Sequence, residues 1–198
     1  HKSVLGAVIL CGAQPIFIEP AVSSDIGIAM SVRTADADAA IKKNPEAKAV
    51  LLVYPTYYGA CCNIKEIAEI VHKHGMVLLV DEAHGPHLKF SDRLPIQAID
   101  AGADISAQST HKILASFTQT SMLHVLYKNI SRERVQAANS IIQSTSPNYL
   151  LLASLDAARM QMACSGEKLI DKAVDLAQSL RRKINEIDGL YCFGDDII

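Results

Sequence analysis

Three polar segments of the sequence hold most of the side chains that could do chemistry. Segments 54–59, 81–84 and 108–112 contain tyrosine and threonine hydroxyls, carboxylates, histidines and a lysine. Each follows a short segment that we predict to be a strand, and the first two of these strands are uninterrupted apolar runs. In an open parallel sheet, ligands bind beyond the carboxyl ends of the strands. We therefore expect the three segments to meet at one edge of a sheet and to form the functional site.

Lys112 is the side chain whose surroundings suggest a reaction. It lies between His111 and the apolar Ile113 and Leu114, in a stretch with few other charges. One interpretation is a lysine on a solvated surface. The other is a partly desolvated amine that loses its proton readily and forms a Schiff base. Pyridoxal-phosphate chemistry needs such a lysine, together with an acid that keeps the ring nitrogen of the cofactor protonated. Asp81, at the end of the preceding apolar run, is the candidate acid.

Two other interpretations of the segment around Asp81 are weaker. Asp-Glu-Ala-His also occurs in helicases, but those need a G-x-x-x-x-G-K-[ST] phosphate loop, and this sequence has neither that loop nor a basic excess. Asp81, His84 and His87 could be proposed as zinc ligands. Gly85 and Pro86 disfavour a helical pairing of the two histidines, and no third nitrogen or sulfur ligand has a suitable spacing. We expect a polar loop and no metal site.

The elements that would position these segments alternate between strand and helix. Uninterrupted apolar runs at 49–53 and 76–80 predict strands covered on both faces, and helical spacing over 64–72 predicts a helix between them. Further strands are expected at 105–107 and 122–126. This order indicates right-handed strand–helix–strand units. The predicted fold class is α/β, with a mostly parallel sheet flanked by helices and a helical C-terminal linker.

The remaining predictions concern the two ends of the chain. A helix capped by Ser3 and stopped by Gly12 is expected first, followed by a short strand at 15–18. The other expected helices cover 34–43, 132–142, 149–162 and 166–187. We expect an α/β domain over 1–147 and, over 148–198, helices that lead to a further domain.

Composition excludes several classes of protein. The chain has 198 residues, 49% of them hydrophobic and 20% charged, which predicts a folded domain rather than a disordered chain. A formal charge of −2 and the absence of tryptophan argue against nucleic-acid and anionic-membrane partners. Five cysteines without a CxxC pair indicate buried reduced thiols, and no apolar run reaches eighteen residues. We expect a cytoplasmic protein.

Longer motifs carry a resemblance to a known family. The segments Asp81–His87, Gly102–Asp104, Gln108–Lys112, Gln119–Val125, Ser144–Pro147 and His1–Ser3 resemble the Orn/Lys/Arg decarboxylases. The resemblance covers almost the whole chain, and the Ser-Thr-His-Lys segment joined to the upstream Asp-x-Ala-His is its most specific part. It implies the aspartate-aminotransferase fold and pyridoxal 5'-phosphate as cofactor. It also implies decarboxylation of lysine, arginine or ornithine to the amine and CO2.

The resemblance implies roles for individual residues. Lys112 would form the Schiff base with the cofactor, Asp81 would face the ring nitrogen, and Lys112 or His111 would protonate the substrate carbon. The other residues that it places near the cofactor are His1 and Ala83 against the ring, Ser109 and His111 at the phosphate, Thr56 in a nearby loop, Ser144 (or Thr145 and Ser146) across a dimer interface, and His84, for which it implies no role.

The resemblance also implies parts that lie outside this sequence. The family's phosphate-binding loop would precede His1 and a C-terminal domain would follow Ile198. We therefore expect the large cofactor-binding domain of a longer enzyme that forms a homodimer or a higher oligomer. The alternatives are an aminotransferase or another pyridoxal-phosphate enzyme of the same fold, which the fold alone does not separate, and a cofactor-free regulatory relative. The presence of both Asp81 and Lys112 argues against the regulatory relative.

Overall fold

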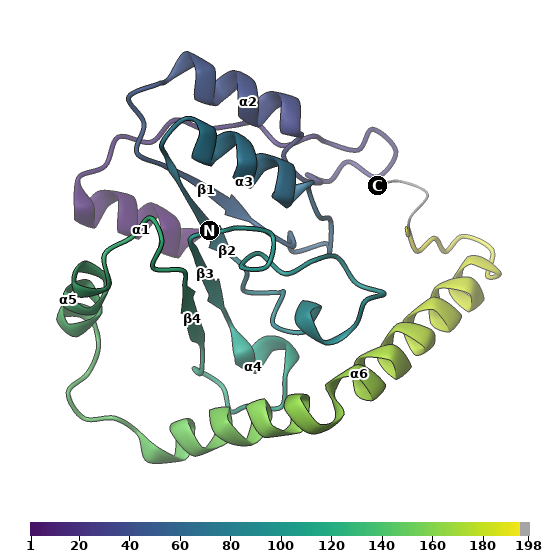
Figure 1. Ribbon diagram of the computed structural model, residues 1–198. Helices are drawn as coiled ribbons and strands as arrows, with labels where there is room; N and C mark the ends of the chain where they lie inside the picture. Colours follow the sequence, from purple (N-terminus) through teal and green to yellow (C-terminus); the bar gives the residue numbers. More distant parts are fainter. Residues whose placement is uncertain (195–198) are drawn as a thin grey trace.

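A four-stranded sheet with helices around it forms the centre of the computed structural model, which describes residues 1–194 (Figure 1). The strands, in their order across the sheet, are β1 (Ala49–Val53), β2 (Val77–Asp81), β3 (Ile105–Gln108) and β4 (Met122–Val125). β1, β2 and β3 run parallel, and β4 is antiparallel to β3. The predicted α/β fold with a mostly parallel sheet is confirmed.

Six α-helices and one 3-10 turn are present in the described part of the chain. They are α1 (Lys2–Cys11), α2 (Thr34–Lys43), α3 (Ile64–Lys73), the turn η1 (Leu88–Phe90), α4 (Thr110–Ile113), α5 (Arg132–Ile142) and α6 (Tyr149–Asn185). Figure 1 shows α2 and α3 together on one side of the sheet, while α6 runs past α4 at the opposite end of the molecule. None of the helices within residues 1–194 combines the length and the apolar character needed to cross a membrane.

The hydrophobic core lies between α3 and one face of β1 and β2. The buried side chains of α3 are Ile64, Ile67, Ala68 and Val71, and they pack into one cluster with Val50, Leu52, Leu78 and Val80 of the strands. The three- and four-residue spacing on α3 produces a single apolar stripe, which is why this helix lies flat on the sheet. Each fully buried aliphatic side chain contributes about 1.5–3 kcal/mol. This packing holds the ends of β1 and β2 in register.

β1 is covered on one face only. Val50 and Leu52 are buried, whereas Ala49, Leu51 and Val53 are exposed. The uninterrupted apolar run predicted coverage on both faces, and for β1 that prediction is wrong in the described chain. The reason is that α2 and α3 both pack into the core on the side of Val50 and Leu52.

Several local predictions also differ from the structure. Residues 15–18 form no strand, since no backbone hydrogen bond joins them to another described segment. His1 rather than Ser3 caps α1, because His1 Nδ1 accepts a hydrogen bond from the Ser3 backbone N–H at 3.3 Å. The two helices expected over 149–187 are one continuous helix. Within the described residues all cysteines are free thiols, but none is fully buried: Cys11 and Cys164 are exposed, and the others are half-buried.

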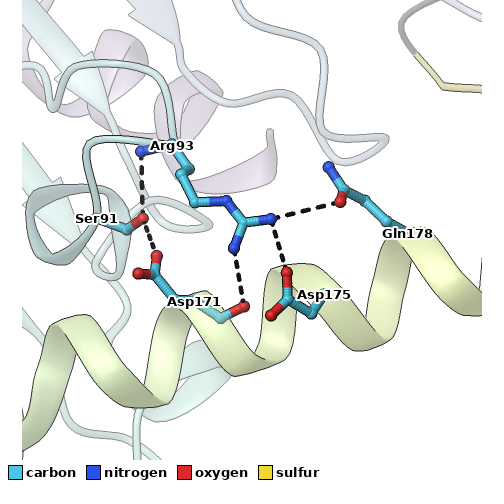
Figure 2. Close-up of polar contacts among 5 residues, drawn as sticks. All are labelled: Ser91, Arg93, Asp171, Asp175 and Gln178. Carbon is cyan, nitrogen blue, oxygen red and sulfur yellow. Dashed lines mark hydrogen bonds and ion pairs between the residues drawn. The ribbon is translucent and has the colours of Figure 1, made fainter.

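Polar contacts attach α6 to the segment that follows η1 (Figure 2). Ser91 Oγ donates to Asp171 Oδ1 at 2.5 Å. The Arg93 guanidinium is 2.8 Å from Asp175 Oδ1 and also donates to the Asp171 carbonyl at 3.3 Å and to Gln178 Oε1 at 3.4 Å. The helix predicted as a linker therefore packs back onto the α/β part of the chain.

Candidate active site

The carboxyl ends of the three parallel strands lie next to one another. The strand register pairs Val53 with Asp81 and Asp81 with Ala107. Segments 54–59, 81–84 and 108–112 therefore leave the sheet from neighbouring points on one edge. This is the convergence that the apolar runs predicted, and it follows from the parallel direction of β1, β2 and β3.

Lys112 and Asp81 both interact with His84. Lys112 lies on α4, and its Nζ is 3.3 Å from Nε2 of His84. Burial lowers the pKa of His84, the positive charge of Lys112 lowers it further, and the negative charge of Asp81 opposes the change. The two residues that the sequence paired are thus within electrostatic range of one imidazole. Their positions relative to a bound cofactor stay a prediction.

The side chain of Lys112 is exposed in the described chain. This differs from the partly desolvated amine that the local sequence suggested. The physical reason is that α4 has only 4 residues and extends from the end of β3, so little protein surrounds the amine. Among residues 1–194, Lys112 makes no ion pair with a carboxylate.

Asp81 keeps one carboxylate oxygen available. It is the last residue of β2 and is half-buried. Its Oδ1 accepts a hydrogen bond from the Ala83 backbone N–H at 3.2 Å, and no described residue donates to its Oδ2. An aspartate with a free oxygen at a strand end is suited to hold a protonated ring nitrogen.

Ser109 and His111 belong to the same short helix, α4, the first as its N-cap and the second within its first turn. Nδ1 of His111 is 2.7 Å from the Thr120 carbonyl oxygen, so Nδ1 carries the hydrogen and Nε2 remains available. Ser109 is the N-cap residue of α4 and is half-buried. Its hydroxyl has no hydrogen-bond partner within residues 1–194, which leaves it available for a ligand oxygen.

Glu82 is a buried acid next to the candidate site that the sequence analysis missed. Its side chain is fully buried beside Asp81. Oε1 accepts from the Ala98 backbone N–H at 2.8 Å, and Oε2 accepts from Ser106 Oγ at 2.5 Å and from Gln108 Nε2 at 2.9 Å. Oε1 of Gln108 is in turn 3.0 Å from Nε2 of His124 on β4. The network joins three strands and a loop beneath the site, and the only sequence signal for it is an acid directly after a buried strand.

Within residues 1–194, no hydrogen bond joins three of the predicted residues to Lys112. Each bonds within its own segment: His1 Nδ1 with Ser3 Oγ at 2.7 Å, Thr56 Oγ1 with the Ala60 N–H at 3.2 Å, and Ser144 Oγ with the Ser146 N–H at 3.1 Å. His1 and Ser144 are exposed, and Thr56 is half-buried. Their roles at a cofactor stay predictions.

The described chain also contains a hollow that is lined by other residues. It has a volume of about 570 Å³ and is lined by residues 21–25, 30–34 and 60–63. None of the predicted site residues lines it. Across residues 1–194, no group of three or more His, Cys, Asp or Glu side chains is arranged to hold a metal ion.

Comparison with known proteins decides the family. The sequence model described as "Orn/Lys/Arg decarboxylase, major domain" matches residues 1–198. The chain belongs to the Orn/Lys/Arg decarboxylase family. Arginine decarboxylase of Bacillus subtilis (strain 168) is 42% identical over 198 residues, which are 100% of this family member and 40% of that protein. Lysine decarboxylase LdcA of Pseudomonas aeruginosa is 30% identical over 210 residues, and the match covers 94% of this chain and 28% of that protein. This member of the Orn/Lys/Arg decarboxylase family therefore spans less than half the length of these relatives.

Solved structures agree with the fold of the Orn/Lys/Arg decarboxylase family. Constitutive lysine decarboxylase of E. coli superimposes with a TM-score of 0.74 at 22% identity, covering 96% of this chain and 29% of that one. Mouse CSAD in its apo form superimposes with a TM-score of 0.66 at 21% identity, and the match covers 96% of this chain and 43% of that one. Identities this low show the fold alone, which is that of the aspartate aminotransferases.

Proposed function

We propose that this chain is the cofactor-binding large domain of a pyridoxal-phosphate-dependent decarboxylase. Its substrate would be lysine, arginine or ornithine, and its products the amine and CO2. The observation that carries the proposal is the placement of Lys112 and Asp81 at adjacent strand ends, where both interact with His84. The names of the relatives, arginine and lysine decarboxylases, support the substrate class.

The side chains present fit pyridoxal 5'-phosphate. The Lys112 amine has no carboxylate partner in residues 1–194 and suits the aldehyde group. Asp81 has an oxygen without a donor and suits the ring nitrogen. The unpartnered hydroxyl of Ser109 suits the phosphate. Ala83, between Asp81 and His84, has a side chain small enough for a flat ring to lie against it.

When bound, the cofactor supplies an electron sink for the bond between the substrate Cα and its carboxylate. Lys112 would hold it covalently through Nζ. Asp81 would keep a proton on the ring nitrogen, because a nearby carboxylate stabilises the positive charge. His111, whose Nδ1 is bonded to Thr120, would present Nε2 toward the substrate, and His111 or Lys112 would return a proton to Cα.

We also propose that the enzyme is a cytoplasmic homodimer or higher oligomer. α1 and α5 bury none of their side chains. Large apolar side chains flank the exposed Ser144: Ile142 is 78% exposed and Leu150 is 72% exposed. Exposed apolar patches of this kind mark protein–protein contacts. Such a contact would let Ser144 reach the cofactor phosphate of a second subunit.

Covalent labelling of the full-length protein tests the proposed function. The wild-type protein and a Lys112→Ala variant are incubated with pyridoxal 5'-phosphate, reduced with borohydride and digested. The masses of the peptides are then measured by mass spectrometry. We expect the reduced cofactor on Lys112 of the wild type and none on this peptide in K112A. Lys65→Ala, at an exposed position on α3, is the control and should label like the wild type. Label on a different lysine, or none, would contradict the proposal.

Product analysis separates the proposed reaction from its alternatives. The wild-type protein should release CO2 and one amine from lysine, arginine or ornithine, and K112A should lose at least about 10³-fold in rate. Formation of a keto acid without CO2 would indicate an aminotransferase instead.

A further inference from the structure

His84 contacts the reactive end of Lys112 directly. It lies in the turn after β2, and its Nε2 is 3.3 Å from Lys112 Nζ. Its ring also packs edge-on against Tyr57, with ring centroids 5.7 Å apart and an interplanar angle of 75°. Tyr57 contacts Tyr58 in the same edge-on manner at 5.3 Å. The imidazole is thus held at the amine by an aromatic pair from the loop after β1.

The contact determines which atom of His84 carries a hydrogen. A protonated lysine amine has three donors and no acceptor, so Nε2 of His84 must accept and the hydrogen must be on Nδ1. The charged and titratable groups that face His84 are Lys112, Asp81 and Tyr57. Burial and Lys112 together lower the pKa of His84 despite the opposing effect of Asp81. At neutral pH the imidazole is therefore uncharged, with a free electron pair directed at Lys112.

The neighbouring imidazole is placed differently. Nδ1 of His111 is bonded to the Thr120 carbonyl, and within residues 1–194 no hydrogen bond joins His111 to the amine of Lys112. His84 is thus the base that the described residues offer to this amine.

We propose that His84 takes a proton from the Lys112 ammonium and so prepares the amine to bond covalently with an aldehyde. In this step one N–H bond of the ammonium breaks, the proton passes to Nε2 of His84, and the electron pair stays on Nζ. A lysine in water has a pKa of about 10.4, so at neutral pH few such amines are free to attack without a base. The inference rests on the proposed function, because it takes Lys112 as the lysine that binds the cofactor.

The test measures how fast pyridoxal 5'-phosphate attaches to Lys112. Cofactor is removed from the full-length protein and added back, and attachment is followed by absorbance and by borohydride trapping from about pH 6 to about pH 9. Two variants distinguish two possible roles of His84, which are to hold the Lys112 amine by a hydrogen bond and to accept its proton. His84→Gln keeps an oxygen that accepts a hydrogen bond but takes no proton, whereas His84→Ala removes both abilities. His74→Gln is the matched control, because His74 bonds to the Ile70 carbonyl at the end of α3.

We expect H84Q and H84A to attach cofactor about 10²-fold more slowly than the wild type near neutral pH. The difference should shrink as the pH rises, because the amine then loses its proton to water. Free imidazole should restore part of the rate to H84A, and H74Q should match the wild type. Equal melting temperatures show that the variants are folded, and if H84A does not fold, H84Q alone carries the test.

Two results would overturn the inference. One is attachment to H84Q at the wild-type rate, which would mean that His84 only orients the amine. The other is a deficit that is the same at every pH, which would indicate a purely structural effect. Failure of the proposed function is distinguishable from both, because it would appear as absence of cofactor on Lys112 in the wild-type protein itself.

Discussion

Among single residues, the buried Glu82 constrains the geometry around the candidate site through its hydrogen bonds. Its buried carboxylate accepts hydrogen bonds from Ala98, Ser106 and Gln108, which come from a loop and from β3. Gly85 packs directly on it, since a Cβ at position 85 would lie 2.5 Å from Glu82 Cγ. A buried donor that loses its acceptor costs about 1–3 kcal/mol. The network therefore ties the end of β2, and with it Asp81, to the strand that leads to Lys112.

Replacing Glu82 should weaken the fold around the site. Glu82→Ala leaves three donors without an acceptor, so we expect a loss of about 3–5 kcal/mol, measured as a lower midpoint of urea unfolding of the full-length protein. Glu82→Gln retains one acceptor oxygen and should lose roughly half as much. Glu69→Ala, at an exposed position on α3, is the control and should change stability by less than about 0.5 kcal/mol. An E82A midpoint equal to that of E69A would contradict the expectation.

At the scale of elements, the position of α6 depends on a close approach as well as on polar contacts. A Cβ at Gly166 would lie 2.9 Å from Cδ1 of the Phe90 ring. Arg93 and Asp175 are largely exposed, with side chains 40% and 68% accessible, and exposed ion pairs contribute at most about 1 kcal/mol. The packing of Phe90 on Gly166 is therefore expected to determine where the helix lies on η1.

A double-mutant cycle tests this packing. Gly166→Ala gains about 1 kcal/mol of helix propensity but forces the Phe90 ring to move, which costs about 1–3 kcal/mol, so we expect a net loss of stability. In a Phe90→Ala background the clash is absent, and the same substitution should be neutral or stabilising by up to about 1 kcal/mol. Arg93→Ala should cost less than about 1 kcal/mol. Thermal unfolding of the wild type, the two single variants and the double variant measures the coupling energy. A coupling energy of zero would show that the Phe90 ring does not limit the size of the side chain at position 166.

For the whole molecule, the distribution of exposed apolar side chains is the main unexplained feature of the described chain. The second half of α5 and the start of α6 carry Ile141, Ile142, Tyr149 and Leu150, all more than 70% exposed. Water-exposed aliphatic side chains in such number are unfavourable in an isolated domain. We therefore expect this surface to be covered by a second copy in the assembled enzyme.

Charged substitutions on this surface should weaken assembly. Ile142→Asp and Leu150→Asp each remove about 1.5–3 kcal/mol of apolar burial, so each should raise the dissociation constant at least about 10-fold. Light scattering of the full-length protein over a dilution series measures the change in mass. Lys65→Asp, on the exposed side of α3, is the control and should leave the mass unchanged. A wild-type protein that is monomeric at every concentration would contradict the expectation.

The sequence alone determined the type and approximate bounds of most elements and the convergence of the strand ends. Apolar runs and helical spacing located the four strands and α2, α3 and α5, because these signals depend on residues close together in the chain. The order of strands and helices then placed Asp81 and Lys112 at one edge, since parallel strands end on the same side of a sheet. Those inferences needed no knowledge of which distant residues touch.

Only the tertiary structure decided burial, pairing and side-chain contact. Coverage of one face of β1 depends on where α2 and α3 pack, and a strand at 15–18 would need a partner strand that the described residues lack. α6 continues through Gly166, where the Phe90 ring lies too close for a Cβ, and that approach joins residues far apart in the chain. The partners of Glu82 and the contact between His84 and Lys112 join residues 16 to 28 positions apart. Such contacts form only when the folded sheet brings those segments together, so no local pattern encodes them.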